Sequence, residues 1–173
     1  MDNTVAAGTG TTLRLWHRFE APPERVFAAW TRPEALKLWW CPAGWSPVQI
    51  DVDLRLGGAY RLSMNRESGA NLVTVHGRFL EIQPPGRLVY TWRWDGLFSD
   101  MPETIVTVEF RAAAGGTELA LRQGVLELPM CGRHLTGWLA ACGRLEAVGE
   151  PRTLLDQLGA SRNTENRPAA GFV

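Results

Sequence analysis

The stretch LPMCGRHLTGWLAACGRLEAVG, residues 128–149, decides the fold because it predicts one long helix near the end of the chain. Pro129 suits the first turn of a helix, where a missing N–H costs nothing, and Gly149 followed by Pro151 is a stop signal. Apolar residues at steps of three and four give this helix one apolar stripe. The stripe consists of Cys131, Leu135, Trp138, Leu139, Cys142 and Leu145, and Arg133, Ala140 and Arg144 lie opposite it.

Three glycines interrupt the predicted helix, at Gly132, Gly137 and Gly143. Each one costs roughly 1 kcal/mol of helix stability relative to Ala. Two interpretations are open. Either the glycines allow the helix to approach a sheet closely, or they are neutral drift in a helix that its apolar stripe holds in place.

The chain before this helix alternates between apolar and polar residues, as β-strands do. The predicted strands cover residues 11–20, 48–54, 59–65, 72–83, 87–95, 104–111 and 118–123. The strand 48–54 places Val48, Ile50, Val52 and Leu54 on one face. Two short helices are predicted after the first strand, and a capping-box pattern from Thr31 to Glu34 opens the second of them.

Short turns between the later strands predict an antiparallel meander. One face of that sheet must be covered, and the final helix has a matching apolar stripe. The sequence therefore predicts an α+β fold in the order β-α-α-β6-α. In this fold a curved antiparallel sheet wraps around the long C-terminal helix.

Size and composition are those of one globular domain. The chain has 173 residues, of which 45% are hydrophobic and 21% charged. We expect the domain to cover residues 11–150, between a disordered segment 1–10 and a mostly disordered tail 151–173. Lys and Arg (18) balance Asp and Glu (18), which argues against nucleic-acid binding. No apolar run predicts membrane insertion and no signal sequence is evident, so we expect a cytoplasmic protein.

Eight tryptophans are unusual for this length. They favour either a roomy interior with aromatic walls or simply a Trp-rich core. The three cysteines, Cys41, Cys131 and Cys142, show no CxxC spacing, and no HExxH motif occurs. The sequence therefore predicts neither a metal site nor a cofactor.

Several segments together resemble a known family: APPERVFAAWTRPEALKLWWCPAGW, DLRLGGAYRLSM, GRFLEIQPPGRLVYTW, VTVEF, GGTELAL and GRHLTGW. Over residues 12–149 the chain resembles the activator of heat-shock protein 90 ATPase homologue-like family, within the START-related, birch-pollen-allergen-like (SRPBCC) superfamily. The resemblance implies a helix-grip fold with a cavity between the sheet and the C-terminal helix. Two positions depart from the family pattern. Cys41 stands where relatives often have Gly in a WWGP run, and Gln123 stands where a His often follows the LxL pattern of the last strand.

The functions that this superfamily implies are diverse, and include lipid and steroid carriers, hormone receptors, cyclases and co-chaperones. A hydrophobic ligand site needs aromatic walls and a few polar groups that fix orientation. Strand parity and the helix stripe predict such a lining. It comprises Trp39, Trp40, Tyr90, Trp92, Trp94, Val108, Phe110, Leu121, Gln123, His134, Trp138 and Cys142.

Two of these residues are candidate acid–base groups. His134 lies near the start of the long helix, and a histidine titrates in the range that acid–base work at neutral pH requires. Tyr90 is the second candidate, and Gln123 would orient a substrate. The alternative interpretation of His134 is a packing or hydrogen-bonding residue, so the sequence names no catalytic residue firmly.

Three hypotheses follow. The first is a binding protein for a small apolar or aromatic ligand, held between sheet and helix. The second is a cyclase- or hydrolase-like enzyme that uses the same cavity. The third is a chaperone-associated, stress-response module that uses the outer face of the sheet. A homodimer is compatible with all three.

Overall fold

The computed structural model describes residues 10–69 and 72–147, which form seven strands and three helices in the order predicted from the sequence. The elements are β1 (Gly10–Phe19), α1 (Pro23–Thr31), α2 (Pro33–Trp39), β2 (Trp45–Val52), β3 (Ala59–Arg66), β4 (Leu72–Gln83), β5 (Arg87–Asp95), β6 (Thr104–Ala113), β7 (Gly116–Glu127) and α3 (Leu128–Ala147). The α+β helix-grip fold is thereby confirmed. The predicted disordered segments 1–10 and 151–173 lie outside the described residues, except that Gly10 begins β1.

The strands form one antiparallel sheet in the order β1-β7-β6-β5-β4-β3-β2. Each strand from β2 to β7 pairs with its neighbour in sequence, as the short turns predicted. The first strand, β1, joins the far edge of the sheet by pairing with β7. The two edge strands, β1 and β2, are therefore consecutive strands of the chain that lie at opposite edges of the sheet.

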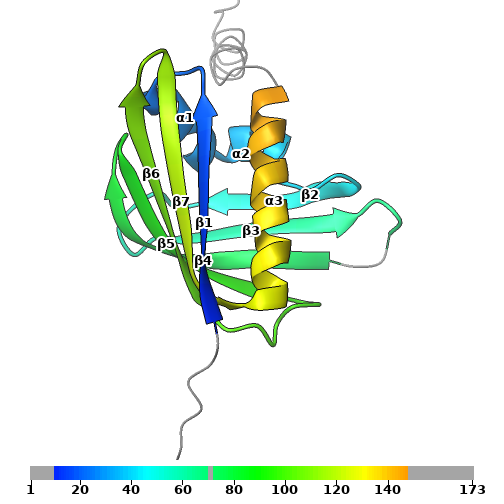
Figure 1. Ribbon diagram of the computed structural model, residues 1–173. Helices are drawn as coiled ribbons and strands as arrows, with labels where there is room; N and C mark the ends of the chain where they lie inside the picture. Colours follow the sequence, from blue (N-terminus) through cyan, green and yellow to red (C-terminus); the bar gives the residue numbers. More distant parts are fainter. Residues whose placement is uncertain (1–9, 70–71, 148–173) are drawn as a thin grey trace, which may run out of the picture.

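The sheet curves around α3, as Figure 1 shows. In that view β6, β7 and β1 run along the helix, whereas β2, β3 and β4 pass behind it. The inward positions of β5, β6 and β7 are buried, which the alternation of apolar and polar residues predicted. The core thus lies between the concave face of the sheet and one side of α3.

The buried side of α3 consists of His134, Trp138, Ala141, Cys142 and Leu145. Burial of a large apolar side chain stabilises the fold by roughly 1.5–3 kcal/mol, so this stripe holds the helix on the sheet. One stripe residue was predicted wrongly. Leu139 is 48% exposed because the stripe is centred on Trp138 and Cys142, and a neighbour of Trp138 points about 100° away from it.

The glycines of α3 do not mark a close approach to the sheet. A Cβ atom added at Gly132, Gly137 or Gly143 would meet nothing within 4 Å, and all three residues are exposed. The interpretation of close helix–sheet packing is therefore wrong. The helix is held by its buried stripe, as the alternative interpretation required.

The two short helices close one end of the space inside the sheet. The predicted capping box at the start of α2 is absent, because Arg32 occupies the N-cap position and its side chain makes no capping bond. The hydroxyl of Thr31 instead donates to the carbonyl of Phe27 within α1. Proline at the first positions of both helices starts them without a side-chain cap.

An arginine of α3 secures the end of α2. Arg144 donates from Nε to the carbonyl of Trp39 at 2.9 Å and from Nη2 to the carbonyl of Trp40 at 3.4 Å. The last carbonyls of a helix lack intrahelical partners, so this guanidinium satisfies groups that α2 leaves open. Arg144 was predicted to lie opposite the stripe, but it faces α2.

The strand β2 differs most from its prediction. A register shift between Pro47 and Gln49 interrupts the alternation, so that Val48 is 60% exposed while Ile50 is buried. Leu54 lies beyond the strand end and is 41% exposed. The predicted common face is therefore wrong at Val48 and Leu54, whereas Ile50 and Val52 both pack on the core.

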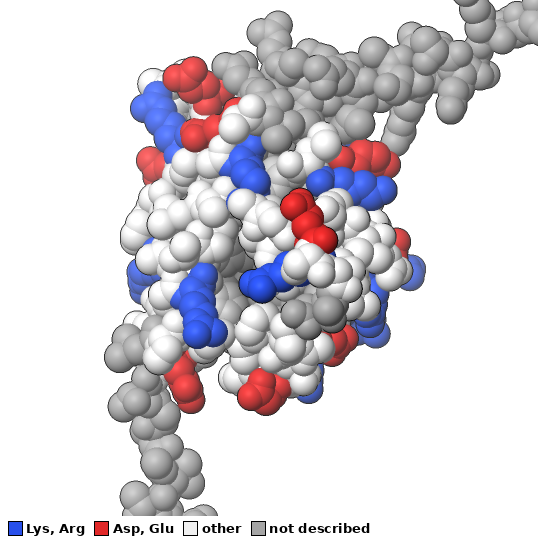
Figure 2. All heavy atoms as spheres, turned by 90° about the vertical axis from the view of Figure 1, so that its right-hand side faces the viewer, with Lys and Arg blue, Asp and Glu red and all other residues white. Residues whose placement is uncertain are grey.

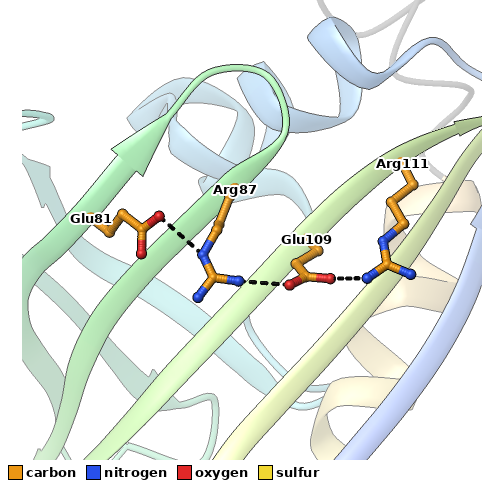
Figure 3. Close-up of polar contacts among 4 residues, drawn as sticks. All are labelled: Glu81, Arg87, Glu109 and Arg111. Carbon is orange, nitrogen blue, oxygen red and sulfur yellow. Dashed lines mark hydrogen bonds and ion pairs between the residues drawn. The ribbon is translucent and has the colours of Figure 1, made fainter.

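The outer face of the sheet carries a row of charged side chains (Figure 3). Arg87 lies between Glu81 and Glu109, at 3.1 Å and 2.6 Å, and Glu109 also contacts Arg111. The row crosses β4, β5 and β6, which makes this part of the outer face polar. Among the described residues, no helix is both long and apolar enough to cross a membrane.

Candidate functional site

A pocket of about 230 Å³ lies between the first half of α3, the end of β5 and the segments 40–45 and 98–101. Figure 2 shows the side of the molecule on which these elements meet, and the surface there is hollowed. Basic side chains lie on both sides of the hollow (Figure 2). The pocket is lined by Trp40, Pro42, Trp45, Met64, Trp92, Trp94, Phe98, Met101, Met130, Arg133, His134, Gly137, Trp138 and Ala141.

Five of the predicted lining residues meet at this pocket. They are Trp40, Trp92, Trp94, His134 and Trp138. Two others, Trp39 and Tyr90, line a separate space of about 30 Å³ deeper in the core, roughly the size of one water molecule. The remaining five belong to the packed interior and line neither space: Val108, Phe110, Leu121, Gln123 and Cys142.

The interior away from the pocket is filled by aromatic rings. Trp30 stacks on Trp138 with a centroid distance of 5.8 Å and contacts Phe110 edge-on at 5.9 Å. The middle of α3 and the α1–α2 pair are therefore joined by solid packing around Trp30. In this part of the molecule the tryptophans form a Trp-rich core, as one of the two interpretations required.

Nine of the fourteen lining residues were not predicted from the sequence, and several of them come from loops and strand ends. Phe98 and Met101 belong to the β5–β6 loop, and Pro42 and Trp45 follow α2. Met64 had a usable signal, because it shares strand parity with the buried Tyr60 and Leu62. Loop residues carry no such period, so their position required the three-dimensional structure.

Both ring nitrogens of His134 are engaged. The indole Nε1 of Trp94 donates to Nε2 at 3.1 Å, and Nδ1 lies 3.0 Å from the carbonyl of Met130. Since Trp94 can only donate, Nε2 must be the unprotonated nitrogen, and Nδ1 carries the proton that Met130 accepts. Burial also lowers the pKa of His134, which favours the same neutral form.

This arrangement fits the packing interpretation of His134 better than an acid–base role. A general base needs a free lone pair, and the one on Nε2 points to Trp94. Tyr90 is similarly placed for structure. Its hydroxyl accepts a 3.4 Å hydrogen bond from Trp30, and burial raises the pKa of this phenol far above neutrality.

Gln123 joins three elements from a fully buried position. Its Nε2 donates to the Thr104 hydroxyl at 3.0 Å, and its Oε1 accepts from Trp138 Nε1 at 3.0 Å. The amide thereby connects β6, β7 and α3. Its predicted role of orienting a substrate remains without geometric support, because Gln123 does not line the pocket.

One buried donor at the pocket has no protein acceptor. Trp92 is 6% exposed, and its Nε1–H makes no hydrogen bond with any residue that the structure describes. Four other indoles at or near the core, those of Trp30, Trp39, Trp94 and Trp138, each donate to a protein atom. Among the described tryptophans, Trp92 is the one whose indole nitrogen is buried and has no partner.

Two of the three thiols, those of Cys41 and Cys142, are buried. Burial raises the pKa of Cys41 to about 11 and that of Cys142 to about 12, so both remain protonated at neutral pH. Within residues 10–69 and 72–147, no group of His, Cys, Asp and Glu residues is arranged to hold a metal ion.

Comparison with known proteins assigns this chain to a family. Residues 20–150 match the family model described as Activator of Hsp90 ATPase homolog 1-like protein, and the chain belongs to this family. It lies within the SRPBCC superfamily that the sequence resemblance indicated. A search of curated proteins found no significant match.

Solved structures similar to this chain agree with this assignment. A Chromobacterium violaceum protein is 31% identical, with a TM-score of 0.72 over 79% of this chain and 95% of its own. The AHSA1 protein from Silicibacter pomeroyi is 30% identical, with a TM-score of 0.70 over 79% and 96%. A Rhodobacter sphaeroides protein is 26% identical, with a TM-score of 0.70 over 80% and 91%. Family membership supports, in general terms, a ligand-binding or chaperone-associated module.

Proposed function

We propose that the protein binds one small apolar or aromatic molecule in the pocket between the first half of α3 and the end of β5. The observation that supports this proposal is the composition of the lining. Six of its fourteen residues are aromatic and three are methionine, while Arg133 is the one member with a formal charge at neutral pH. Such a lining, with few polar groups, is typical of sites for apolar ligands.

The volume limits the size of the ligand. An engineered apolar cavity of about 150 Å³ accepts benzene, and drug-sized ligands occupy pockets of roughly 300–1,000 Å³. At about 230 Å³, this pocket suits a substituted single ring or two fused rings. Methionines such as Met64 and Met101 have flexible side chains that adapt to such a guest.

Gly137 is a position at which a substitution can fill the pocket without disturbing the core. It lines the pocket from the exposed side of α3, and an added Cβ meets nothing within 4 Å. A leucine at this position would occupy the space of the ligand. Gly143 lies on the same helix in equally open surroundings but does not line the pocket, which makes Gly143→Leu the matched control.

The test is a fluorescence titration with N-phenyl-1-naphthylamine, a neutral dye that brightens in apolar surroundings. We expect saturation at one dye per chain for the wild type and for Gly143→Leu, and at least tenfold weaker binding for Gly137→Leu. Absence of saturable binding to the wild type would refute the proposal. Equal binding by both variants would place the dye elsewhere on the protein.

A further inference from the structure

We infer that the ligand of this pocket carries a neutral hydrogen-bond acceptor, such as a carbonyl or ether oxygen, which receives the indole N–H of Trp92. The inference rests on the proposed function and specifies the chemical class of the ligand: an aromatic ketone, aldehyde, lactone or aryl ether rather than a pure hydrocarbon. It depends on one side chain that lines the pocket and whose donor has no partner.

Trp92 is enclosed by other aromatic side chains. Its indole lies between Trp138, at 5.1 Å, and Trp94, at 5.5 Å, and it is almost completely removed from solvent. It lines the pocket in the midst of otherwise apolar side chains. A buried donor without an acceptor costs about 1–3 kcal/mol, so natural proteins rarely leave one.

The surroundings of Trp92 show that nearby polar atoms are already committed. His134 lies next to Trp92, with ring centroids 6.4 Å apart, but the lone pair on its Nε2 already accepts a hydrogen bond from Trp94. The amide oxygen of Gln123 accepts from Trp138. The two acceptors that serve the neighbouring indoles are therefore in use, and an oxygen atom of a guest would supply the missing one.

The chemistry of the guest oxygen follows from the burial of this donor. An ionised carboxylate at this depth would lose its hydration, at a cost far above that of one hydrogen bond. A neutral carbonyl or ether oxygen loses much less and gains a bond of ordinary strength. The pocket should thus prefer a neutral acceptor placed inside and should leave any charged substituent at the mouth.

The test compares two probes of nearly the same shape, 2-acetylnaphthalene and 2-isopropenylnaphthalene, in which a methylene group replaces the carbonyl oxygen. Both are measured by displacement of N-phenyl-1-naphthylamine from the wild type, Trp92→Phe and Trp16→Phe. The ratio of the two affinities in the wild type should fall about 3- to 10-fold in Trp92→Phe, the range expected for one net hydrogen bond. The ratio should stay unchanged in Trp16→Phe, because Trp16 is exposed and does not line the pocket.

Each protein is characterised by the ratio of its two affinities. In the comparison of these ratios, the unequal hydration of the two probes cancels, and so does the volume that Trp92→Phe adds to the pocket. An unchanged ratio in Trp92→Phe would overturn the inference while leaving the proposed function intact, and would show that a buried water or an aromatic face satisfies this N–H. Failure of both probes to displace the dye would instead refute the proposed function. A second measurement needs no variant: the assigned indole proton resonance of Trp92 should move downfield with the ketone and not with the hydrocarbon.

Discussion

The indole nitrogen of Trp94 donates a 3.1 Å hydrogen bond to Nε2 of His134, which fixes the histidine as the neutral tautomer that is protonated on Nδ1. This bond joins the end of β5 to the first half of α3 across the wall of the pocket. The residue that sequence reasoning offered as an acid–base candidate therefore acts as a structural contact. Its titration should be visible in stability rather than in a reaction rate.

Stability should fall in mildly acidic solution because of His134. Its pKa in the folded protein is lowered from 6.5 by burial, so the unfolded chain takes up the proton first as the pH falls. The stabilising contribution of neutral His134 is complete above pH 6.5 and is lost progressively below it. The total loss is about 1.4 kcal/mol for each pH unit by which the pKa in the folded protein lies below 6.5. Urea unfolding at pH 8 and pH 5.5 measures the loss.

The matched variant for this prediction is His134→Gln, whose amide oxygen can accept from Trp94 but does not titrate. The difference in unfolding free energy between the two pH values should be smaller in the variant than in the wild type. An identical difference in both proteins would contradict the assignment to His134.

Removal of the amide of Gln123 should destabilise the fold through Trp138. Gln123→Met keeps a side chain of similar length but leaves the Trp138 donor unpaired in the core, at an expected cost of about 1–3 kcal/mol. The same substitution in a Trp138→Phe background should cost less, because that donor is then absent. Equal costs in the two backgrounds, measured by urea unfolding, would show that the Gln123–Trp138 bond contributes nothing.

Alanine in place of the exposed glycines of α3 should stabilise the protein. Gly132 and Gly143 lie in open surroundings, so that Ala adds helix propensity without a clash. We expect each substitution to raise the free energy of unfolding by up to about 1 kcal/mol. A loss of stability in either variant would mean that the glycine has a packing role that this structure does not show.

Arg133 should favour a ligand with an anionic group at the mouth of the pocket. It lines the pocket, is exposed, and has no ion-pair partner among the described residues. Arg133→Gln should weaken the binding of 2-naphthoate by about 2- to 5-fold, the range of an exposed ion pair, and less so in high salt. Binding of the neutral 2-acetylnaphthalene should stay the same. A parallel loss for both probes would assign Arg133 a role in packing instead of charge.

The fold was predictable because it depends on two simple periods. Alternation along β5, β6 and β7 identified the inward residues, and the stripe around Trp138 and Cys142 identified the helix that covers them. The errors in predicted burial occur where local structure overrides the periodicity of apolar residues. A register shift displaces Val48, and the stripe allowed Leu139 as a member although the helix turns it outward.

The site was predictable only in part, because its walls come from both regular and irregular structure. Parity places Trp92 and Trp94 inside but says nothing of Phe98 and Met101, which reach the pocket from a loop. Nor does sequence reveal which polar groups satisfy one another. Gln123 faces inward as predicted, yet its partners Trp138 and Thr104 come from other elements.

The pairing of β1 with β7 has a consequence for synthesis of the protein. Partners such as Phe19 and Thr117 meet only after most of the domain has left the ribosome, and α3 emerges later still. Contacts between distant segments form slowly and leave apolar surface exposed in the meantime. The tryptophan-rich inner face of the sheet therefore stays uncovered until translation is nearly finished. During this interval, aggregation or capture by a chaperone competes with folding.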